Sequence, residues 1–199
     1  MARKLVALIP LFLLSWTYAA VAQEQVFHMD PGQSRVDFTL GDVLHTVHGT
    51  FKLSSGELRF DSKTGQASGQ LVVDAASGDS GNGSRDKKMK REILETDKYP
   101  TIVFTPEKVV GNVAPGAASQ VQLAGSMMLH GQAHPMTLVV PVRVNGSNAS
   151  ADVHFTVPYV AWGLKNPSTL FLRVDKQVDI VVHAVGTLST ETAQAQGSH

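Results

Sequence analysis

The sequence predicts an all-β protein, a closed antiparallel barrel with one short amphipathic helix packed on it. Apolar and polar residues alternate with a period of two over much of the chain, as expected of strands with one buried face. Short turns rich in Gly, Asn, Asp and Ser separate these runs and indicate antiparallel neighbours, because parallel strands need long crossovers. A single segment shows helical spacing instead. Roughly eight or more such strands in one chain favour a barrel over a sandwich.

The expected strands follow one another along the chain with no internal repeat or linker between them. The first alternating run has Val36, Phe38 and Leu40 at its apolar positions. A turn at Asp61–Gly65 marks a hairpin. The expected strands are residues 35–40, 46–53, 58–60, 68–75, 101–105, 121–129, 136–144, 151–157 and 178–184. These strands form one domain.

The segment between two of these strands breaks the alternation. Residues 76–83 (ASGDSGNG) are expected to form a flexible loop, and Ser84 is expected to cap a helix over residues 85–95. Met89 and Ile93 are four residues apart and therefore share one face of this helix, which would pack on the barrel. Lysine and arginine side chains occupy the rest of its surface.

The N-terminal 22 residues have the three parts of an export signal peptide. Arg3 and Lys4 supply positive charge, and the apolar run Leu5–Leu14 is too short to cross a bilayer as a helix. Ala20-Val21-Ala22 is a small-x-small cleavage site. We therefore expect a signal peptide at 1–22, a barrel domain at 23–188 and a disordered tail at 189–199, in a bacterial protein exported to the periplasm. An uncleaved membrane anchor is the alternative for the first segment.

The composition excludes several classes of function. The 199-residue chain carries 17 Lys and Arg against 17 Asp and Glu, so it lacks the basic surplus of a general nucleic-acid binder. It contains no cysteine, which excludes disulfides, thiol catalysis and cysteine-ligated metal centres. It also lacks the G-x-S-x-G motif of serine hydrolases.

Histidines are the candidates for a metal site. His45 and His48 are three residues apart, so a regular strand would point them to opposite faces unless a bulge intervenes. His130 and His134 flank a turn and would face each other across a hairpin. No third ligand lies at a matching spacing, so we expect no metal. We also expect no cofactor and no catalytic residue.

The interior of the barrel has two interpretations. Small residues stand among large ones on the expected inner faces, at Gly49, Gly69, Gly125 and Ala75. They either leave room for a ligand or mark bends in a filled core. The residue pattern leaves both open, and a filled barrel that binds a protein partner is one rival function.

Short motifs follow one another along the mature chain. They are Ser34–Phe38 (SRVDF), His45–Phe51 (HTVHGTF), Gly56–Asp61 (GELRFD), Gly81–Asp86 (GNGSRD), Asp97–Phe104 (DKYPTIVF), Leu129–Leu138 (LHGQAHPMTL) and Trp162–Leu164 (WGL). In this order and spacing, over residues 26–186, they resemble the YceI-like family of exported, lipocalin-like proteins. The sequence departs from the family at Ala75-Ala76-Ser77, where an isoleucine-bearing strand end is usual, and at the second histidine, His48.

The resemblance implies an eight-stranded antiparallel barrel with a helix packed on it and an elongated apolar tunnel. The tunnel would hold a polyisoprenoid or a similar long-chain lipid, which favours the ligand cavity over the filled core. The protein would bind or carry this lipid in the periplasm, without nucleic acid, and its basic helix would make transient contact with a membrane surface. The rival from another class is an enzyme that acts on a lipid-like substrate with His45 and either Arg85 or Asp86.

The expected lipid-binding residues lie on inward strand positions and at the mouth. The tunnel wall would consist of Phe38, Val47, Phe51, Phe60, Leu71, Val73, Phe104, Leu123, Met127, Leu138 and Phe155. Met89 and Ile93 would close the tunnel from the helix. The polar and aromatic groups near the mouth would be Arg85, Asp86, Tyr99 and Trp162. His45 shares a face with Val47 and Phe51 by alternation, so it would contact the head group.

Overall fold

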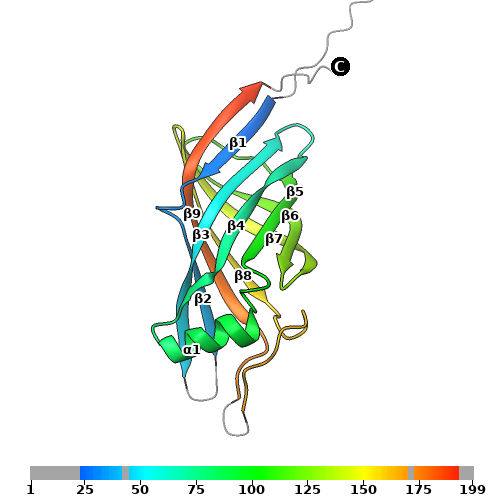
Figure 1. Cartoon of the computed structure of the whole chain (residues 1–199). Coiled ribbons are helices and arrows are strands. Elements are labelled where there is room, and N and C mark those ends of the chain that lie inside the picture. The colour runs from blue at the N-terminus through cyan, green and yellow to red at the C-terminus, as the bar shows by residue number, and fades with distance from the viewer. Residues whose placement is uncertain (1–22, 42–44, 170–172, 193–199) are drawn as a thin grey trace, which may run out of the picture.

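The computed structural model describes residues 23–41, 45–169 and 173–192, which form nine strands and one short helical segment (Figure 1). The strands are β1 (Gln23–Met29), β2 (Arg35–Gly41), β3 (Thr46–Asp61), β4 (Ala67–Asp79), β5 (Thr101–Val110), β6 (Ala118–Leu129), β7 (Gln132–Asn145), β8 (Asn148–Val157) and β9 (Val178–Thr192). The helical segment is α1 (Gly83–Lys88), continued by the π-helical turn η1 (Met89–Ile93). The expected signal peptide lies outside the described residues.

All the strand pairs are antiparallel, and the strands close into a barrel. β1 and β2 run one after the other in a single position between β3 and β9. The chain turns between them at Asp30, whose Oδ1 accepts a hydrogen bond from Gly32 N at 2.8 Å. β3 also pairs with β4, which joins the two ends of the strand order. The nine strands thus occupy eight positions, and the predicted eight-stranded barrel with one short helix is confirmed.

The alternation in the sequence did not predict β1. Its apolar residues are Val26, Phe27 and Met29, so only the pair Phe27 and Met29 follows the period of two. Pairing with β3 and β9 holds this strand in the barrel. Gln23 pairs with Thr192, so β9 includes residues 189–192, which the sequence analysis had assigned to the tail. The first and last described residues therefore lie side by side, at the end of the barrel away from α1 (Figure 1).

The wall is less continuous between β7 and β8 than between β6 and β7. β6 pairs with β7 over most of its length, whereas the β7–β8 register covers only Val142–Asn145 of β7. The connection after β8 lies against β7, where Trp162 stacks on His134 with ring centroids 4.0 Å apart. Tyr159 and Leu164 of the same connection belong to the buried core. This connection therefore completes the wall.

Helix α1 begins earlier than expected because Asn82 caps it. The Asn82 side-chain oxygen accepts hydrogen bonds from Ser84 N and Arg85 N, both at 3.1 Å. The prediction of Ser84 as the cap was therefore wrong. The segment becomes π-helical after the first turns and ends at Ile93 rather than Glu95.

Strand β4 continues into the segment that was expected to be a loop. It runs to Asp79, which pairs with Thr50 of β3. The register between β3 and β4 shifts along this stretch, and the Ser77 hydroxyl accepts a hydrogen bond from Lys52 N at 2.8 Å. Small side chains hide the alternation here, so the expected loop over residues 76–83 is wrong in its first half.

Candidate functional site

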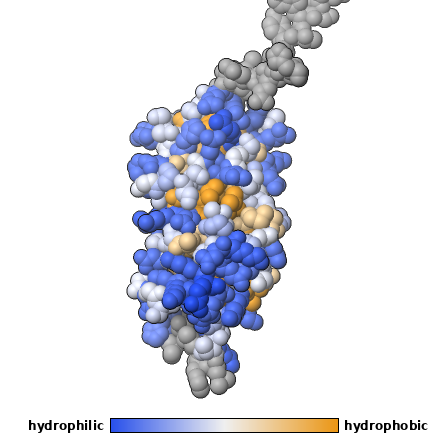
Figure 2. All heavy atoms as spheres, viewed as in Figure 1, coloured by the Kyte–Doolittle hydropathy of each residue, from blue (hydrophilic) through white to orange (hydrophobic). Residues whose placement is uncertain are grey.

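A cavity of about 550 Å³ lies inside the barrel, and every strand, α1, η1 and the connection after β8 contribute to its wall. Among the lining residues that the structure describes, the polar side chains are Ser80, Arg85, Lys88, Ser150 and Tyr159. The face of the molecule in Figure 2 is mostly hydrophilic, with a small apolar patch near its middle. The interior is hollow and apolar, as the ligand-cavity interpretation requires.

Most of the residues expected in the tunnel line this cavity. On the strands they are Phe38, Val47, Phe51, Phe60, Leu71, Val73, Phe104, Leu123, Met127, Leu138 and Phe155, and on the helical segment Arg85, Met89 and Ile93. They lie in regular strands or at helical spacing, where the face of a side chain follows from its position. Phe38 and Phe51 also contact each other, with ring centroids 5.3 Å apart.

His45 and Asp86 were expected near the mouth, and neither is among the residues that line the cavity. His45 is exposed and precedes β3, so the alternation within that strand does not extend to it. Asp86 is buried, and its Oδ1 accepts hydrogen bonds from Ser80 N at 2.9 Å and from the Ser80 hydroxyl at 2.5 Å. The carboxylate therefore orders the β4–α1 connection instead of facing a ligand.

Tyr99 and Trp162 also lie outside the cavity lining and pack against histidines instead. The Tyr99 ring is 4.4 Å from the His130 ring, centroid to centroid, and Trp162 stacks on His134. His130 Nε2 lies 3.1 Å from Glu95 Oε2. The two histidines that were expected to meet across the hairpin thus have separate partners. The described part of the chain holds no group of three His, Cys, Asp or Glu side chains placed to bind a metal.

The small residues of the inner faces do not create the cavity. The lining omits Gly49, Gly69, Gly125 and Ala75. A Cβ atom on Gly125 would collide with the carbonyl oxygen of Thr105 on β5, and one on Gly49 would collide with the Phe38 ring. These glycines therefore permit close approach of a strand or a ring. Of the two interpretations that the sequence left open for these residues, the structure thus does not favour the one in which they leave room for a ligand.

Part of the lining was missed in the sequence. Val178, Ile180 and Val182 alternate along β9 and line the cavity, so the alternation itself could have identified them. Tyr159 and Leu164 lie in the connection after β8, where no period marks an inward residue. Burial raises the pKa of Tyr159, as does the nearby charge of Asp175, and the Tyr159 hydroxyl donates to the Asp175 carbonyl oxygen at 2.6 Å.

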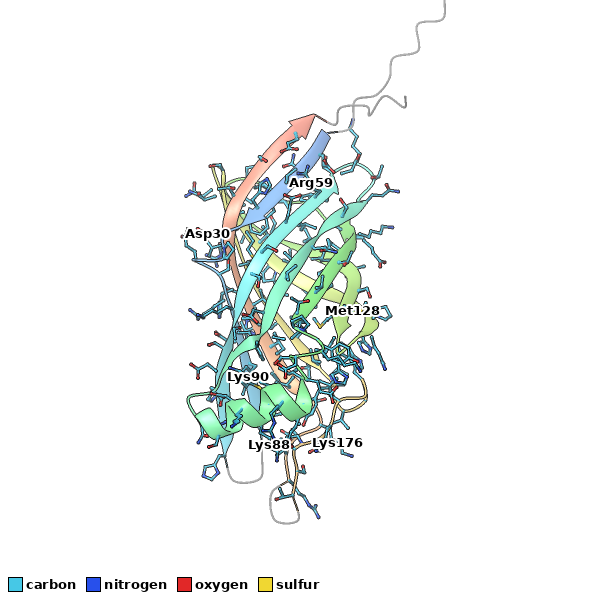
Figure 3. All side chains as sticks on the ribbon, viewed as in Figure 1. Asp30, Arg59, Lys88, Lys90, Met128 and Lys176 are labelled. Atoms are coloured by element: carbon cyan, nitrogen blue, oxygen red, sulfur yellow. The ribbon has the colours of Figure 1, made fainter. Side chains whose placement is uncertain are left out.

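The cavity reaches the surface beside α1. Of the described lining residues, only Arg85 and Lys88 are exposed, and they are also the only charged ones; Figure 3 labels Lys88 on α1. Arg85 Nε donates to Ser80 Oγ at 2.7 Å, and Arg85 Nη2 donates to the Ser80 carbonyl oxygen at 2.8 Å. Since Asp86 binds Ser80 from the other side, a hydrogen-bonded chain fixes the guanidinium at the mouth.

Among the described residues, no helix has the length and apolar character needed to span a membrane. The family model of the YceI-like domain matches residues 27–186. The chain belongs to the YceI-like family. The match covers nearly the same residues as the motifs of the sequence, and it confirms the resemblance that they carry. No curated protein matches the chain.

Several solved structures have the same fold as this YceI-like chain. BcnA of Burkholderia cenocepacia matches with a TM-score of 0.67 and 23% identity, covering 80% of this chain and 99% of that chain. A polyisoprenoid-binding domain from Saccharophagus degradans, implicated in plant cell wall breakdown, matches with a TM-score of 0.61 and 16% identity, covering 87% and 99%. The YCEI protein of Campylobacter jejuni matches with a TM-score of 0.56 and 15% identity, covering 72% of this chain and 86% of that chain. At these identities the likeness concerns the fold.

Proposed function

We propose that this YceI-like protein binds a polyisoprenoid or a similar long-chain lipid in its barrel and carries it in the periplasm. The observation behind this proposal is an apolar cavity of about 550 Å³ whose charged lining residues lie together on α1. Such a cavity receives a long chain through apolar contacts and leaves a polar head at the mouth. The name of the Saccharophagus degradans domain, which has a similar fold, supports this class of ligand.

Apolar contacts are sufficient for useful affinity. Burial of each methylene group contributes about 0.8 kcal/mol, so ten groups contribute roughly 8 kcal/mol before association costs. A net binding free energy of this size corresponds to about micromolar affinity, so a tail must bury more than about ten groups to reach it. A longer isoprenoid tail offsets the association costs, so tight binding requires no catalytic group.

The decisive experiment is native mass spectrometry of the mature protein, purified from its exported form without detergent. Solvent extraction then identifies whatever is bound. We expect a discrete additional mass that extracts as a long apolar lipid. A clean apo mass, together with failure to take up added isoprenoid lipids, would contradict the carrier function.

The periplasmic location is a proposal that rests on the expected signal peptide. Cell fractionation followed by N-terminal sequencing tests it. We expect a mature chain that starts at Gln23 in the periplasmic fraction, whereas an intact N-terminus in the cytoplasm would overturn this location.

Lipid exchange would take place where α1 meets a membrane. Lys87 and Arg91 are exposed on the helical segment beside the mouth, and Figure 3 labels Lys90 on the same segment. Such cations are attracted to anionic lipid surfaces. We expect the protein to cosediment with vesicles that contain anionic phospholipid more than with phosphatidylcholine vesicles, and high salt should remove the difference. Equal sedimentation with both would argue against this contact.

The enzyme alternative has less support. His45 lies outside the cavity lining, and Asp86 already accepts two hydrogen bonds from Ser80. Ser84 and Lys87 have the spacing of a Ser-x-x-Lys motif, but both side chains are exposed and neither lines the cavity. A bell-shaped pH–rate profile on a lipid-like substrate would be needed to favour an enzyme.

A further inference from the structure

We propose that the preferred ligand is a long-chain amphiphile with an anionic head group, a phosphate or a carboxylate, which Arg85 and Lys88 bind at the mouth. This inference rests on the proposed function, because it specifies which long-chain lipids the cavity prefers. Both charged residues of the described lining are positive, and that lining includes no Asp, Glu or His. A chain that fills the cavity and leaves at this mouth therefore ends where the described lining offers only positive charge.

The helical segment combines the two kinds of contact on one face. Arg85 and Lys88 are three residues apart on α1, a spacing that places both side chains on the same side. Met89 and Ile93 follow on η1 and also line the cavity. This face thus presents cations near its start and apolar groups near its end. Lys87 belongs to the same helix but does not line the cavity.

The acidic side chains closest in sequence have other partners. Asp86 accepts its hydrogen bonds from the β4–α1 connection, and Asp79 Oδ1 accepts a backbone N–H at 2.8 Å. Glu92 Oε2 lies 3.6 Å from Lys165 Nζ. Within the described part of the chain, the Lys88 side chain forms no hydrogen bond or ion pair. Among the described residues, no carboxylate forms an ion pair with Arg85 or Lys88.

Arg85 is held with one edge available. Its Nε and Nη2 donate to Ser80, whereas Nη1 makes no hydrogen bond among the described residues. A guanidinium edge is well suited to the oxygens of a phosphate or carboxylate. Asp86 acts as a positioning residue, because it anchors Ser80 and through it the orientation of Arg85.

The expected preference is moderate because both cations are exposed. An exposed ion pair changes an equilibrium constant by about threefold, so two of them predict a preference of about tenfold for an anionic head over a neutral one. Higher ionic strength should weaken this preference, because salt screens exposed charges.

The test compares ligands that share a tail. The first probes are geranylgeraniol, geranylgeranyl monophosphate and geranylgeranylamine. A second pair, arachidic acid and its alcohol, shows whether a carboxylate head is preferred as well as a phosphate head. Affinities are measured by titration on the delipidated mature protein, at low and high salt. The variants are Arg85→Gln, Lys88→Gln and the double variant. Lys87→Gln is the matched control, because it removes the same charge from the same helix outside the cavity.

We expect the monophosphate to bind about tenfold tighter than the alcohol, and the amine to bind most weakly. The ratio should approach one in the double variant and stay unchanged in Lys87→Gln, while affinity for the alcohol persists in all of them. Equal binding of alcohol and monophosphate by the wild type would overturn the head-group inference and leave the lipid-binding proposal intact. A loss of the preference for the monophosphate in Lys87→Gln as large as that in the double variant would also overturn the head-group inference. If no probe binds, the proposed function fails as well.

Discussion

Asp61 orders the turn between β3 and β4 with its own carboxylate. Its Oδ1 accepts hydrogen bonds from Thr64 N at 2.8 Å and from Lys63 N at 2.7 Å. These donors, Thr64 first, lower the pKa of Asp61, because they favour the charged form. Since the pKa is lower in the folded chain, the carboxylate stabilises the fold above the unfolded pKa, and this contribution is lost as pH falls through the folded pKa.

An Asp61→Ala variant should therefore show a pH-dependent loss of stability. We expect its free energy of unfolding to lie below that of the wild type at pH 7, and the difference to shrink as the pH falls below about 4. Urea unfolding at a series of pH values measures this. Ser62→Ala, in the same turn, is the control and should change little. A difference of equal size at every pH would argue against a role for the ionised carboxylate.

At the scale of elements, the helical segment depends on its first residues. Asn82 caps α1 and Asp86 ties the helix back to the end of β4, so the mouth of the cavity is shaped by a short stretch of polar contacts. Ser84 was predicted as the cap, and Asn82, two residues earlier, also has a side chain favoured at this position. Sequence alone did not separate them, because the choice depends on the backbone, which is extended at Asn82.

Replacement of Asn82 and of Ser84 should change the free energy of unfolding by different amounts. Asn82→Ala should lower the free energy of unfolding by about 1 kcal/mol, because Ser84 N and Arg85 N lose their acceptor. Ser84→Ala should have a much smaller effect, because the Ser84 side chain does not cap the helix. Denaturant unfolding of both variants provides the measurement. A larger loss in Ser84→Ala would show that the cap was assigned to the wrong residue.

The elements differ in how far the sequence predicts them. In regular strands the period of two places side chains such as Leu71, Phe104 and Met127 correctly on the inner face, because backbone geometry alone sets the direction. β1 was not predicted because it has only one alternating apolar pair. Its pairing with β3 and β9, which holds it in the barrel, cannot be inferred from the pattern of apolar residues. His45 and Trp162 were misplaced for a related reason, since both lie outside the strands.

At the scale of the whole molecule, the hollow interior is the property on which function depends. Alternation alone could not distinguish a hollow from a filled barrel, because both have apolar inner faces. The cavity volume results from the closure of eight strand positions and from the packing of the connection after β8. Both depend on contacts between residues that are far apart in the sequence. The family resemblance predicted the hollow interior where the pattern did not.

A side chain that projects into the cavity should compete with the lipid. Ala151 on β8 lines the cavity and is half-buried, so Ala151→Phe should fill open space, keep or raise the free energy of unfolding by up to about 2 kcal/mol, and lower lipid occupancy. Val139→Phe, at a position that is 48% exposed, is the matched control and should leave occupancy unchanged. Native mass spectrometry and urea unfolding measure the two effects. A loss of about 1–3 kcal/mol with normal occupancy would instead indicate an overpacked, filled interior.

The pairing of Gln23 with Thr192 has a practical consequence for work with this protein. Both residues lie at the end of the barrel away from α1, whereas Arg85 and Lys88 mark the mouth on α1 itself (Figure 1). An affinity tag or a fluorescent protein joined at either residue would therefore be held at the far end from the mouth. Molecules tethered to a sensor surface through such a tag would present their mouths to the solution, all in the same orientation.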